Sequence, residues 1–209
     1  RLTSAHKQTM AYMTYLGGTL PTEYLMIQDI RNTGDEFIID KGIDLGNNEG
    51  FNFTNPHGAR DLYWVDGTGR WDTTSHWSLT SGGPPGECPP TILDNVYFDA
   101  ASGFEAEDTV YVKMKHASCN DMIWEDDVTN NPILYGDTVN LHIWGSVKLS
   151  TSMTYNFFGK VYFESSHDTD YETIDLGYNL DGTKVYNLYN HTFFFGDSGR
   201  WELQSILFN

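Results

Sequence analysis

The stretch YWVDGTGRWDTTSHWS, residues 63–78, holds three of the six tryptophans of this 209-residue chain. Tryptophan buries a large apolar area, and its ring N–H usually needs a hydrogen-bond partner. The spacers Gly-Thr-Gly and Asp-Thr-Thr-Ser do not place the three rings on one helix face. We therefore predict a short strand, a tight glycine turn and a second short segment folded back, so that Trp64, Trp71 and Trp77 share one small core.

The tryptophan-rich stretch runs into SGGPPGECPP at residues 81–90, whose glycines and prolines exclude regular structure. An aromatic cluster followed by such a loop indicates a junction between two structural units. We predict that residues 1–56 end one unit, residues 57–100 form the junction and residues 101–209 begin the next unit. In this interpretation the three tryptophans are structural and fix the angle between consecutive units.

The second half of the chain repeats a short apolar run that ends at a glycine. Alternating apolar and polar residues between these runs predict strands. The glycines recur at roughly 14–20 residues, which is close to one turn of a parallel β-solenoid. We expect three of the runs to stack as one parallel ladder: Leu141–Trp144, Tyr155–Phe158 and Thr192–Phe195.

An antiparallel sandwich is the alternative arrangement of many short strands. Its hairpins favour two-residue turns such as Asn-Gly or Asp-Gly. The chain has only Asp66-Gly67 and Asp181-Gly182 of this kind. The predicted fold class is therefore all-β, with parallel β-solenoid units joined by an aromatic, Gly/Pro-rich junction.

The charge of the chain limits its partners. The formal net charge is −17, with 29 acidic and 12 basic residues. This balance disfavours nucleic acid and anionic membrane surfaces as partners, and it also suits a plain soluble surface. No apolar run approaches the ~20 residues of a membrane span, so we predict no membrane insertion. Because both ends cut into patterned sequence, we expect a piece of a longer polypeptide, in which missing targeting signals carry no information.

No catalytic motif stands out. The seven histidines form no His-Glu-x-x-His pattern, and no Gly-x-Ser-x-Gly occurs. We therefore predict no enzyme activity and no catalytic, cofactor-binding or metal-binding residues. Calcium is a weak candidate at three acidic turns, none of which has the spacing of a calcium loop, and self-capped acidic turns are the alternative. The turns are Asp66–Gly69 with Asp72, Asp44 with Asn47–Glu49, and Glu125–Asp127.

Tyrosines on the outer faces of strands are candidates for stacking on sugars, although strand tyrosines more often pack as ladders. The candidates are Tyr155, Tyr162, Tyr171, Tyr178, Tyr186 and Tyr189.

The tryptophan-rich stretch also resembles a known family. Its pattern continues as HWS at 76–78, SGG at 81–83, CPPT at 88–91 and DNVYFDA at 94–100. This string is similar to the recurring junction of giant, repetitive gliding-motility adhesins of Bacteroidetes, which the type IX system exports. IDLGNNEGFNF at 43–53 resembles the close of one repeat, and SCNDM at 118–122 with NNP at 130–132 resembles the opening of the next. Asp66 departs from the pattern, where a second glycine is expected.

The resemblance implies a structural and adhesive segment of a cell-surface filament that mediates surface attachment and gliding. Its expected location is extracellular, attached to the outer membrane. Its expected partners are external surfaces or polysaccharide, neighbouring repeats of the same chain, and the motility and secretion machinery. A carbohydrate-binding or carbohydrate-cleaving β-helix is the alternative.

The two cysteines lie in the segment that resembles the repeat opening, and we expect a Cys88–Cys119 disulfide in an oxidising compartment. Two unrelated buried thiols are the alternative. Secreted proteins of these bacteria commonly carry O-linked sugars at Asp-Thr or Asp-Ser sites followed by a small residue. That pattern implies sugar on surface turns at Thr73, Thr109 and Thr138.

Overall fold

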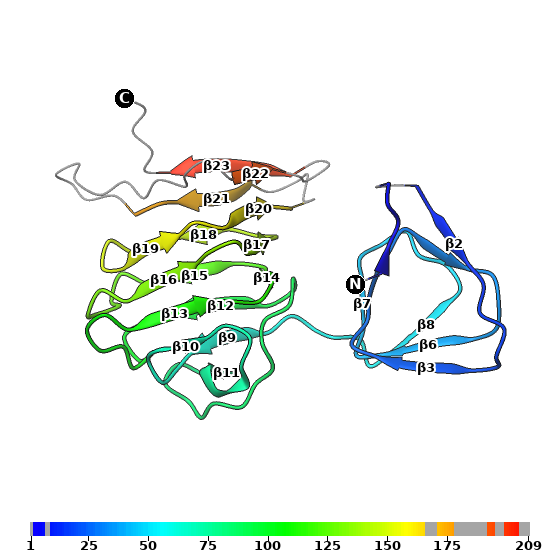
Figure 1. Cartoon of the computed structure of the whole chain (residues 1–209), viewed down its shortest axis with the longest axis horizontal. Coiled ribbons are helices and arrows are strands. Elements are labelled where there is room, and N and C mark those ends of the chain that lie inside the picture. Colours follow the sequence, from blue (N-terminus) through cyan, green and yellow to red (C-terminus); the bar gives the residue numbers. More distant parts are fainter. Residues whose placement is uncertain (1, 7–8, 166–170, 178–191, 195–198, 205–209) are drawn as a thin grey trace. The chain divides into compact units, whose positions relative to one another are not determined.

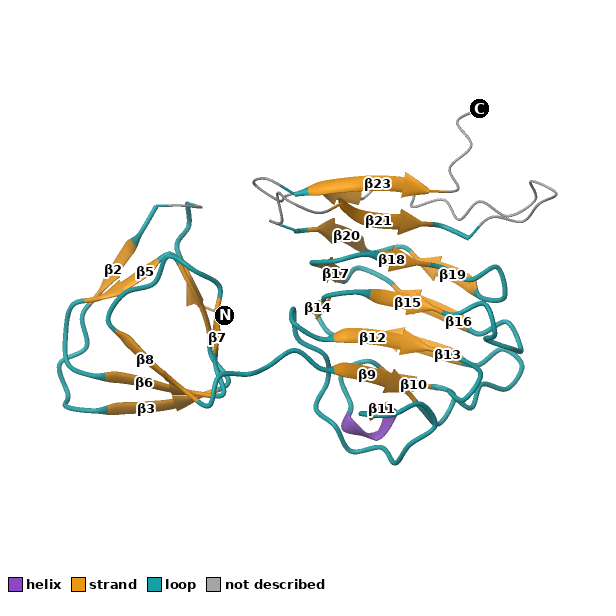
Figure 2. Cartoon of the chain, turned by 180° about the vertical axis from the view of Figure 1, so that it is seen from behind, coloured by secondary structure: helices purple, strands orange, loops and turns teal. Residues whose placement is uncertain are grey.

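The computed structural model describes residues 2–6, 9–165, 171–177, 192–194 and 199–204. These residues form an all-β protein without an α-helix, and its only helical element is the short 3₁₀ turn η1 (Thr74–His76). The strands form six sheets, in which every pair except β9–β11 is parallel. Figure 2 shows the strands and the single helical turn. The chain divides into two compact units, Arg1–Gly58 and Ala59–Asn209.

The first unit has three small parallel sheets, with strand orders β1-β4-β7, β2-β5 and β3-β6-β8. Its core consists of Ile27, Ile30, Phe37 and Ile39. Phe37 and Phe51 lie in register on neighbouring strands, with ring centroids 5.4 Å apart. The strands are β1 (Leu2–Thr3), β2 (Ala11–Met13), β3 (Leu20–Glu23), β4 (Met26–Gln28), β5 (Ile30–Asn32), β6 (Phe37–Asp40), β7 (Ile43–Asp44) and β8 (Phe51–Thr54).

The second unit has three larger sheets, with strand orders β11-β9-β12-β15-β18-β21-β23, β10-β13-β16-β19 and β14-β17-β20-β22. From β12 to β20 the chain visits the three sheets in turn, and each strand from β12 to β18 pairs with the third strand after it, one circuit further on (Figure 1). The early strands are β9 (Asp61–Trp64), β10 (Gly69–Arg70), β11 (Trp77–Ser78), β12 (Asn95–Phe98), β13 (Thr109–Val112), β14 (His116–Cys119), β15 (Met122–Trp124) and β16 (Ile133–Gly136). The later strands are β17 (Asn140–Ile143), β18 (Val147–Lys148), β19 (Thr154–Phe157), β20 (Lys160–Phe163), β21 (Tyr171–Asp175), β22 (Thr192–Phe194) and β23 (Arg200–Gln204).

Alternation of side chains explains why these segments form strands around one core. Buried and partly exposed residues alternate along β12, β16 and β17, so that every second side chain points inward. The same inward position recurs in register from circuit to circuit, as in Val96, Met122 and Val147. Apolar side chains therefore stack on one another inside the unit and are removed from water.

The tryptophan-rich stretch forms the closed end of this core. Trp64, Trp71 and Trp77 are fully buried. The ring of Trp77 packs edge-on against the rings of Trp64 and Trp71, and each pair of ring centroids is 5.1 Å apart. Phe98 stacks on Trp124 one circuit further on, with ring centroids 4.0 Å apart. We call Trp64, Trp71, Trp77, Phe98 and Trp124 the aromatic core.

Hydrogen bonds fix two of the three rings as the sequence predicts. The Trp64 ring N–H donates to Gly67 O at 2.7 Å, and the Trp77 ring N–H donates to Trp71 O at 2.8 Å. The fold-back brings β11 antiparallel against β9, with Trp77 opposite Trp64. Because β11 covers the free edge of β9, this stretch ends the parallel stack on that side.

The predicted junction at residues 57–100 differs from this arrangement. The chain divides at Gly58, near the predicted boundary, but the tryptophans belong to the core of the second unit and do not form a separate element. Their packing against Phe98 explains the difference, since Phe98 lies on a strand of that unit.

The expected single ladder is also corrected. Leu141–Trp144 overlaps β17, which pairs with β20, and β20 pairs with β22. Tyr155–Phe158 overlaps β19, which lies in a different sheet beside β16. Phe195 lies outside the described residues. Glycines such as Gly159 lie at the corners between sheets, and one circuit passes more than one corner. The spacing of roughly 14–20 residues between the glycines is therefore shorter than one full circuit.

Both cysteines are free in the structure, so the predicted Cys88–Cys119 disulfide is wrong. Cys119 occupies an inward position of β14 and is fully buried in the core. Cys88 is exposed in the Gly/Pro-rich loop, where its carbonyl oxygen accepts a 3.4 Å hydrogen bond from Arg60 Nη2. The inward direction of the Cys119 side chain therefore keeps the two thiols apart.

We expect the two thiols of the native protein to react at very different rates. Burial raises the pKa of Cys119 well above its ordinary value, so this thiol stays protonated and shielded at neutral pH. One thiol per chain should react quickly with a thiol reagent, and the second only after unfolding. Cys88→Ser should abolish the fast phase. Unreduced, unfolded protein with no titratable thiol would contradict this assignment.

Candidate functional site

Two successive corners of the second unit differ in length. The loop between β16 and β17 is Asp137–Val139, whereas the loop between β19 and β20 is Phe158–Gly159, one residue shorter. The two loops remain hydrogen-bonded to each other at both of their ends. Phe158 N donates to Gly136 O at 2.7 Å, and Lys160 N donates to Val139 O at 2.9 Å. The longer loop therefore bulges, and a hollow of about 330 Å³ lies between the two loops. We call it the corner hollow.

The floor of the corner hollow depends on a glycine. A side chain at Gly159 would collide with the carbonyl oxygen of Val139 and with the Phe157 ring. Only glycine lets the two corners approach this closely. Thr138 accommodates the bulge on the longer loop with a positive φ of 53°.

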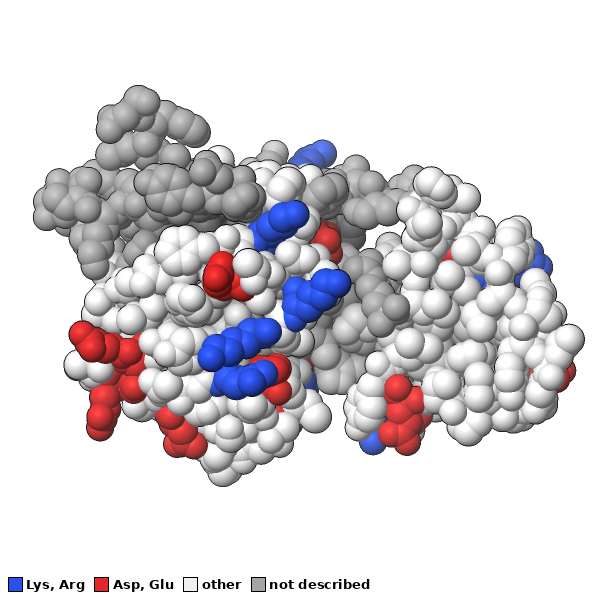
Figure 3. Space-filling view, in the orientation of Figure 1, with Lys and Arg blue, Asp and Glu red and all other residues white. Residues whose placement is uncertain are grey.

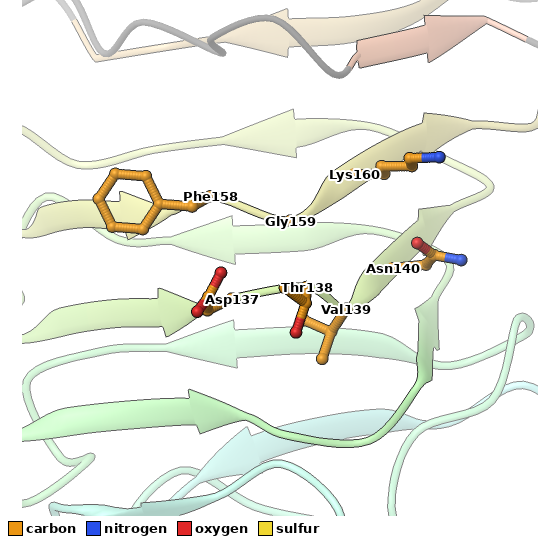
Figure 4. A pocket seen from close by; sticks show the side chains of 7 residues that line it. All are labelled: Asp137, Thr138, Val139, Asn140, Phe158, Gly159 and Lys160. Carbon is orange, nitrogen blue, oxygen red and sulfur yellow. The ribbon is translucent and has the colours of Figure 1, made fainter.

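Phe158 is the exposed apolar residue of the corner hollow. It follows the inward-facing Phe157, so its own side chain points outward, and it is 66% exposed. In Figure 4, Phe158 and Asp137 lie toward one end of the hollow, and Asn140 and Lys160 lie toward the other.

The polar lining supplies both donors and acceptors. Asn140 and Lys160 occupy facing register positions on β17 and β20. The Lys160 ammonium only donates hydrogen bonds, the Asp137 carboxylate only accepts them, and Asn140 does both. The hollow therefore offers both donors and acceptors to a bound group.

Aromatic rings also run up the outer face of the adjoining sheet, β14-β17-β20-β22. His142 stacks on Tyr162 with ring centroids 4.7 Å apart, and Tyr162 stacks on Phe193 with ring centroids 5.2 Å apart. His116 lies 5.4 Å from His142 at the lower end. Rings stacked face to face cover one another, so this ladder offers mainly ring edges to a ligand and serves the cohesion of the sheet.

Polar contacts link the ladder to its surroundings. His142 Nδ1 lies 3.2 Å from Glu164 Oε1, and His116 Nδ1 lies 3.2 Å from both His142 Nε2 and Asn140 Nδ2. Burial, followed by the nearby charges of His142 and Lys115, lowers the pKa of His116 below its ordinary value. Asn140 therefore connects the ladder to the corner hollow.

The three predicted glycosylation sites fall in different environments. Thr109 is 7% exposed and its hydroxyl donates to Glu107 O, so the expectation of a surface site there is wrong. Thr73 is half-buried and its hydroxyl donates to Arg70 O at 2.8 Å. Thr138 is exposed and lines the corner hollow.

The tyrosines considered for sugar binding do not form one row. Burial raises the pKa of Tyr155, Tyr162 is covered by its stacking partners, and Tyr171 is 60% exposed on another sheet. The other candidates lie outside the described residues: Tyr178, Tyr186 and Tyr189.

The acidic turns considered for calcium use their oxygens within the chain. Asp44 Oδ1 accepts from Asn48 Nδ2 at 2.6 Å, and Lys148 Nζ lies 3.0 Å from Glu125 and 3.1 Å from Asp126. Near the glycine turn, Asp72 pairs with Arg70. Among the described residues, no group of three or more His, Cys, Asp or Glu side chains is placed to hold a metal ion.

Sequence reasoning missed Phe158, Asn140 and Lys160 as site residues. A phenylalanine directly before a corner glycine was a usable signal, since the buried Phe157 before it forces Phe158 outward. The hollow itself depends on which loop stacks on which, and that follows only from strand register.

No helix in the described part of the chain is long and apolar enough to cross a membrane. No family model matches the chain, and no curated protein or solved structure matches it either.

Proposed function

We propose that this chain is a structural and adhesive segment of a large, repetitive cell-surface filament protein. In this proposal both units are parallel β-solenoids, and the segment contributes to surface attachment and gliding motility. The observation that carries it is the parallel register of the second unit, in which successive circuits place equivalent side chains on top of one another. The resemblance to gliding-motility adhesins gives the proposal its biological setting.

The physical basis of the proposal is additive stability. In a stack of this kind each circuit contacts only its neighbours, so the free energy of folding is close to a sum of nearest-neighbour terms. Such a chain can lengthen without needing a larger core. The last described strand, β23, has one described neighbour, β21, and the proposed role of a following repeat is to cover such an edge.

The proposed location is extracellular, on a protein attached to the outer membrane. The proposed partners are external surfaces or polysaccharide, neighbouring repeats, and the motility and secretion machinery. The net charge of −17 supports a well-solvated exterior. In Figure 3 acidic side chains of the second unit lie along one edge of the visible face and also beside the basic side chains nearer its middle.

A carbohydrate-binding β-helix is the second candidate, and the exposed Phe158 beside polar groups favours it. Carbohydrate cleavage is less favoured at this hollow. Hydrolysis of a glycosidic bond generally needs two opposed carboxyl groups, and Asp137 is the one carboxylate in the described lining.

The adhesive role predicts that beads coated with this chain remain attached under flow. We expect retention on glass and on polysaccharide-coated surfaces well above that of beads coated with serum albumin. The measurement is the fraction of beads retained as shear increases. Retention equal to the albumin control on every surface would contradict an adhesive role.

A further inference from the structure

The corner hollow has the features of a small ligand site on an otherwise regular stack. Its volume, about 330 Å³, lies at the lower end of the range for small-molecule pockets. Such a volume suits one or two sugar units and is too small for a folded partner. We propose that it binds a neutral saccharide, with the Phe158 ring packed on an apolar sugar face and Asp137, Asn140 and Lys160 hydrogen-bonded to hydroxyl groups.

Phe158 carries the apolar half of this inference. A single exposed apolar residue is common on protein surfaces and means little alone. Here the exposed ring borders a hollow that is also lined by the polar residues Asp137, Thr138, Asn140 and Lys160. An aromatic platform in the same hollow as hydrogen-bonding groups matches a ligand that is apolar on one face and hydroxylated at its rim.

The polar residues that line the hollow support a neutral ligand over a charged one. Each sugar hydroxyl donates and accepts, which fits a lining with the acceptor Asp137, the donor Lys160 and the dual-purpose Asn140. A polyanion would meet the Asp137 carboxylate and the net charge of −17, both of which oppose its approach.

This inference rests on the proposed adhesive function and names the class of its ligand. It also gives the longer corner loop a role that strand stacking does not require. Without the bulge at Asp137–Val139, the two corners would superimpose and close the hollow.

The test is binding of neutral hexasaccharides by the whole chain. Cellohexaose, maltohexaose and laminarihexaose are titrated by calorimetry and by saturation-transfer NMR. We expect at least one to bind, and Phe158→Ala to weaken it about tenfold, the order of an aromatic packing contribution plus its buried area. Asp137→Ala should weaken it as well. Tyr171→Ala, which removes an equally exposed ring from another sheet, should have no effect.

Salt dependence separates the ligand classes. Affinity for a neutral sugar should stay constant between about 0.05 and 0.5 M NaCl, because screening acts only on charged pairs. The inference is overturned if no neutral hexasaccharide binds, if Phe158→Ala and Tyr171→Ala behave alike, or if only oligogalacturonate binds, with affinity that falls as salt rises.

The bead assay distinguishes failure of the site from failure of the function. Wild-type beads that adhere, combined with no hexasaccharide binding, would overturn the saccharide site and leave the adhesive role standing. Hexasaccharide binding that depends on Phe158, combined with beads that never adhere, would overturn the adhesive role and leave the site.

Discussion

Replacing Trp71 with alanine is expected to lower the free energy of unfolding of the second unit by about 3–5 kcal/mol. Trp71 is fully buried and lies against Trp77 and Phe98. Its loss leaves a large cavity in the aromatic core. The effect should spread through the second unit, because the ring is part of that unit's core and not of a separate junction.

Trp71→Phe is the matched control for this prediction. The Trp71 ring N–H is buried without a hydrogen-bond partner among the described groups, so phenylalanine keeps much of the packing and removes an unsatisfied donor. Urea titration followed by hydrogen exchange and mass spectrometry resolves the two units. The alanine variant should lose protection across the second unit at lower urea, while the first unit stays unchanged. Loss confined to the peptides around residue 71 would show that the ring does not support the wider core.

Replacing Asp94 with alanine is expected to cost a similar amount, about 3–5 kcal/mol, because it leaves a half-buried positive charge without its partner. Asp94 is fully buried and accepts hydrogen bonds from Arg60 Nε at 3.0 Å, Arg60 Nη2 at 2.9 Å and Thr91 N at 2.7 Å. These contacts join the start of the second unit to the turn before β12. The double variant Arg60→Met with Asp94→Ala should recover part of the loss.

Asp94 should also make stability depend on pH. Burial raises its pKa, but the hydrogen bonds from Arg60 and Thr91 outweigh burial, so the pKa of Asp94 lies below its ordinary value. This carboxylate therefore stabilises the fold fully above about pH 4, the unfolded value, and the contribution disappears as the pH falls through the folded value.

Urea midpoints measured from pH 7 down to pH 3 test this dependence. Asp94→Ala should flatten the acid limb of the curve. Glu87→Gln, which alters only a longer and more exposed contact with Arg60 at 3.4 Å, should leave the curve close to wild type. An unchanged acid limb in Asp94→Ala would assign the acid sensitivity to other carboxylates.

Local structure was predictable from local patterns. The apolar run at residues 141–144 was predicted as a strand, and β17 covers Asn140–Ile143. The three clustered tryptophans were predicted to share a core, and their rings meet within it. In both cases the signal lies in side-chain spacing, which directly sets which residues face inward.

The arrangement of strands into sheets was not predictable in the same way. The run at residues 155–158 has the same pattern as the run at 141–144, yet β19 and β17 lie in different sheets. A glycine after an apolar run marks the end of a strand without saying which strand stacks above it. The register between strands depends on contacts between residues far apart in the sequence, and the local alternation of apolar residues carries no information about those contacts.

The disulfide prediction was wrong for a related reason. It rested on a resemblance that placed both cysteines in the opening of a repeat, whereas Cys119 lies on a strand with its side chain in the core. The corner hollow was hidden likewise, because it arises from a difference in length between two loops that are stacked only in the folded chain.

The parallel register of the second unit is the central claim, and engineered disulfides test it most directly. Tyr111 and Tyr135 are register partners on β13 and β16, and Ile133 lies two residues earlier on the same face of β16. Partners on neighbouring strands have Cα atoms within the range that a disulfide spans, whereas diagonal positions lie at about 7–8 Å, beyond it.

The measurement is the fraction of chains cross-linked under mild oxidation, in a Cys88→Ser background. We predict that Tyr111→Cys with Tyr135→Cys and Thr109→Cys with Ile133→Cys each cross-link nearly completely, a combination that only parallel strands allow, and that Tyr111→Cys with Ile133→Cys does not. Cross-linking of the Tyr111–Tyr135 pair without the Thr109–Ile133 pair, or cross-linking of the diagonal pair as complete as that of the register pairs, would contradict the parallel in-register stack on which the account depends.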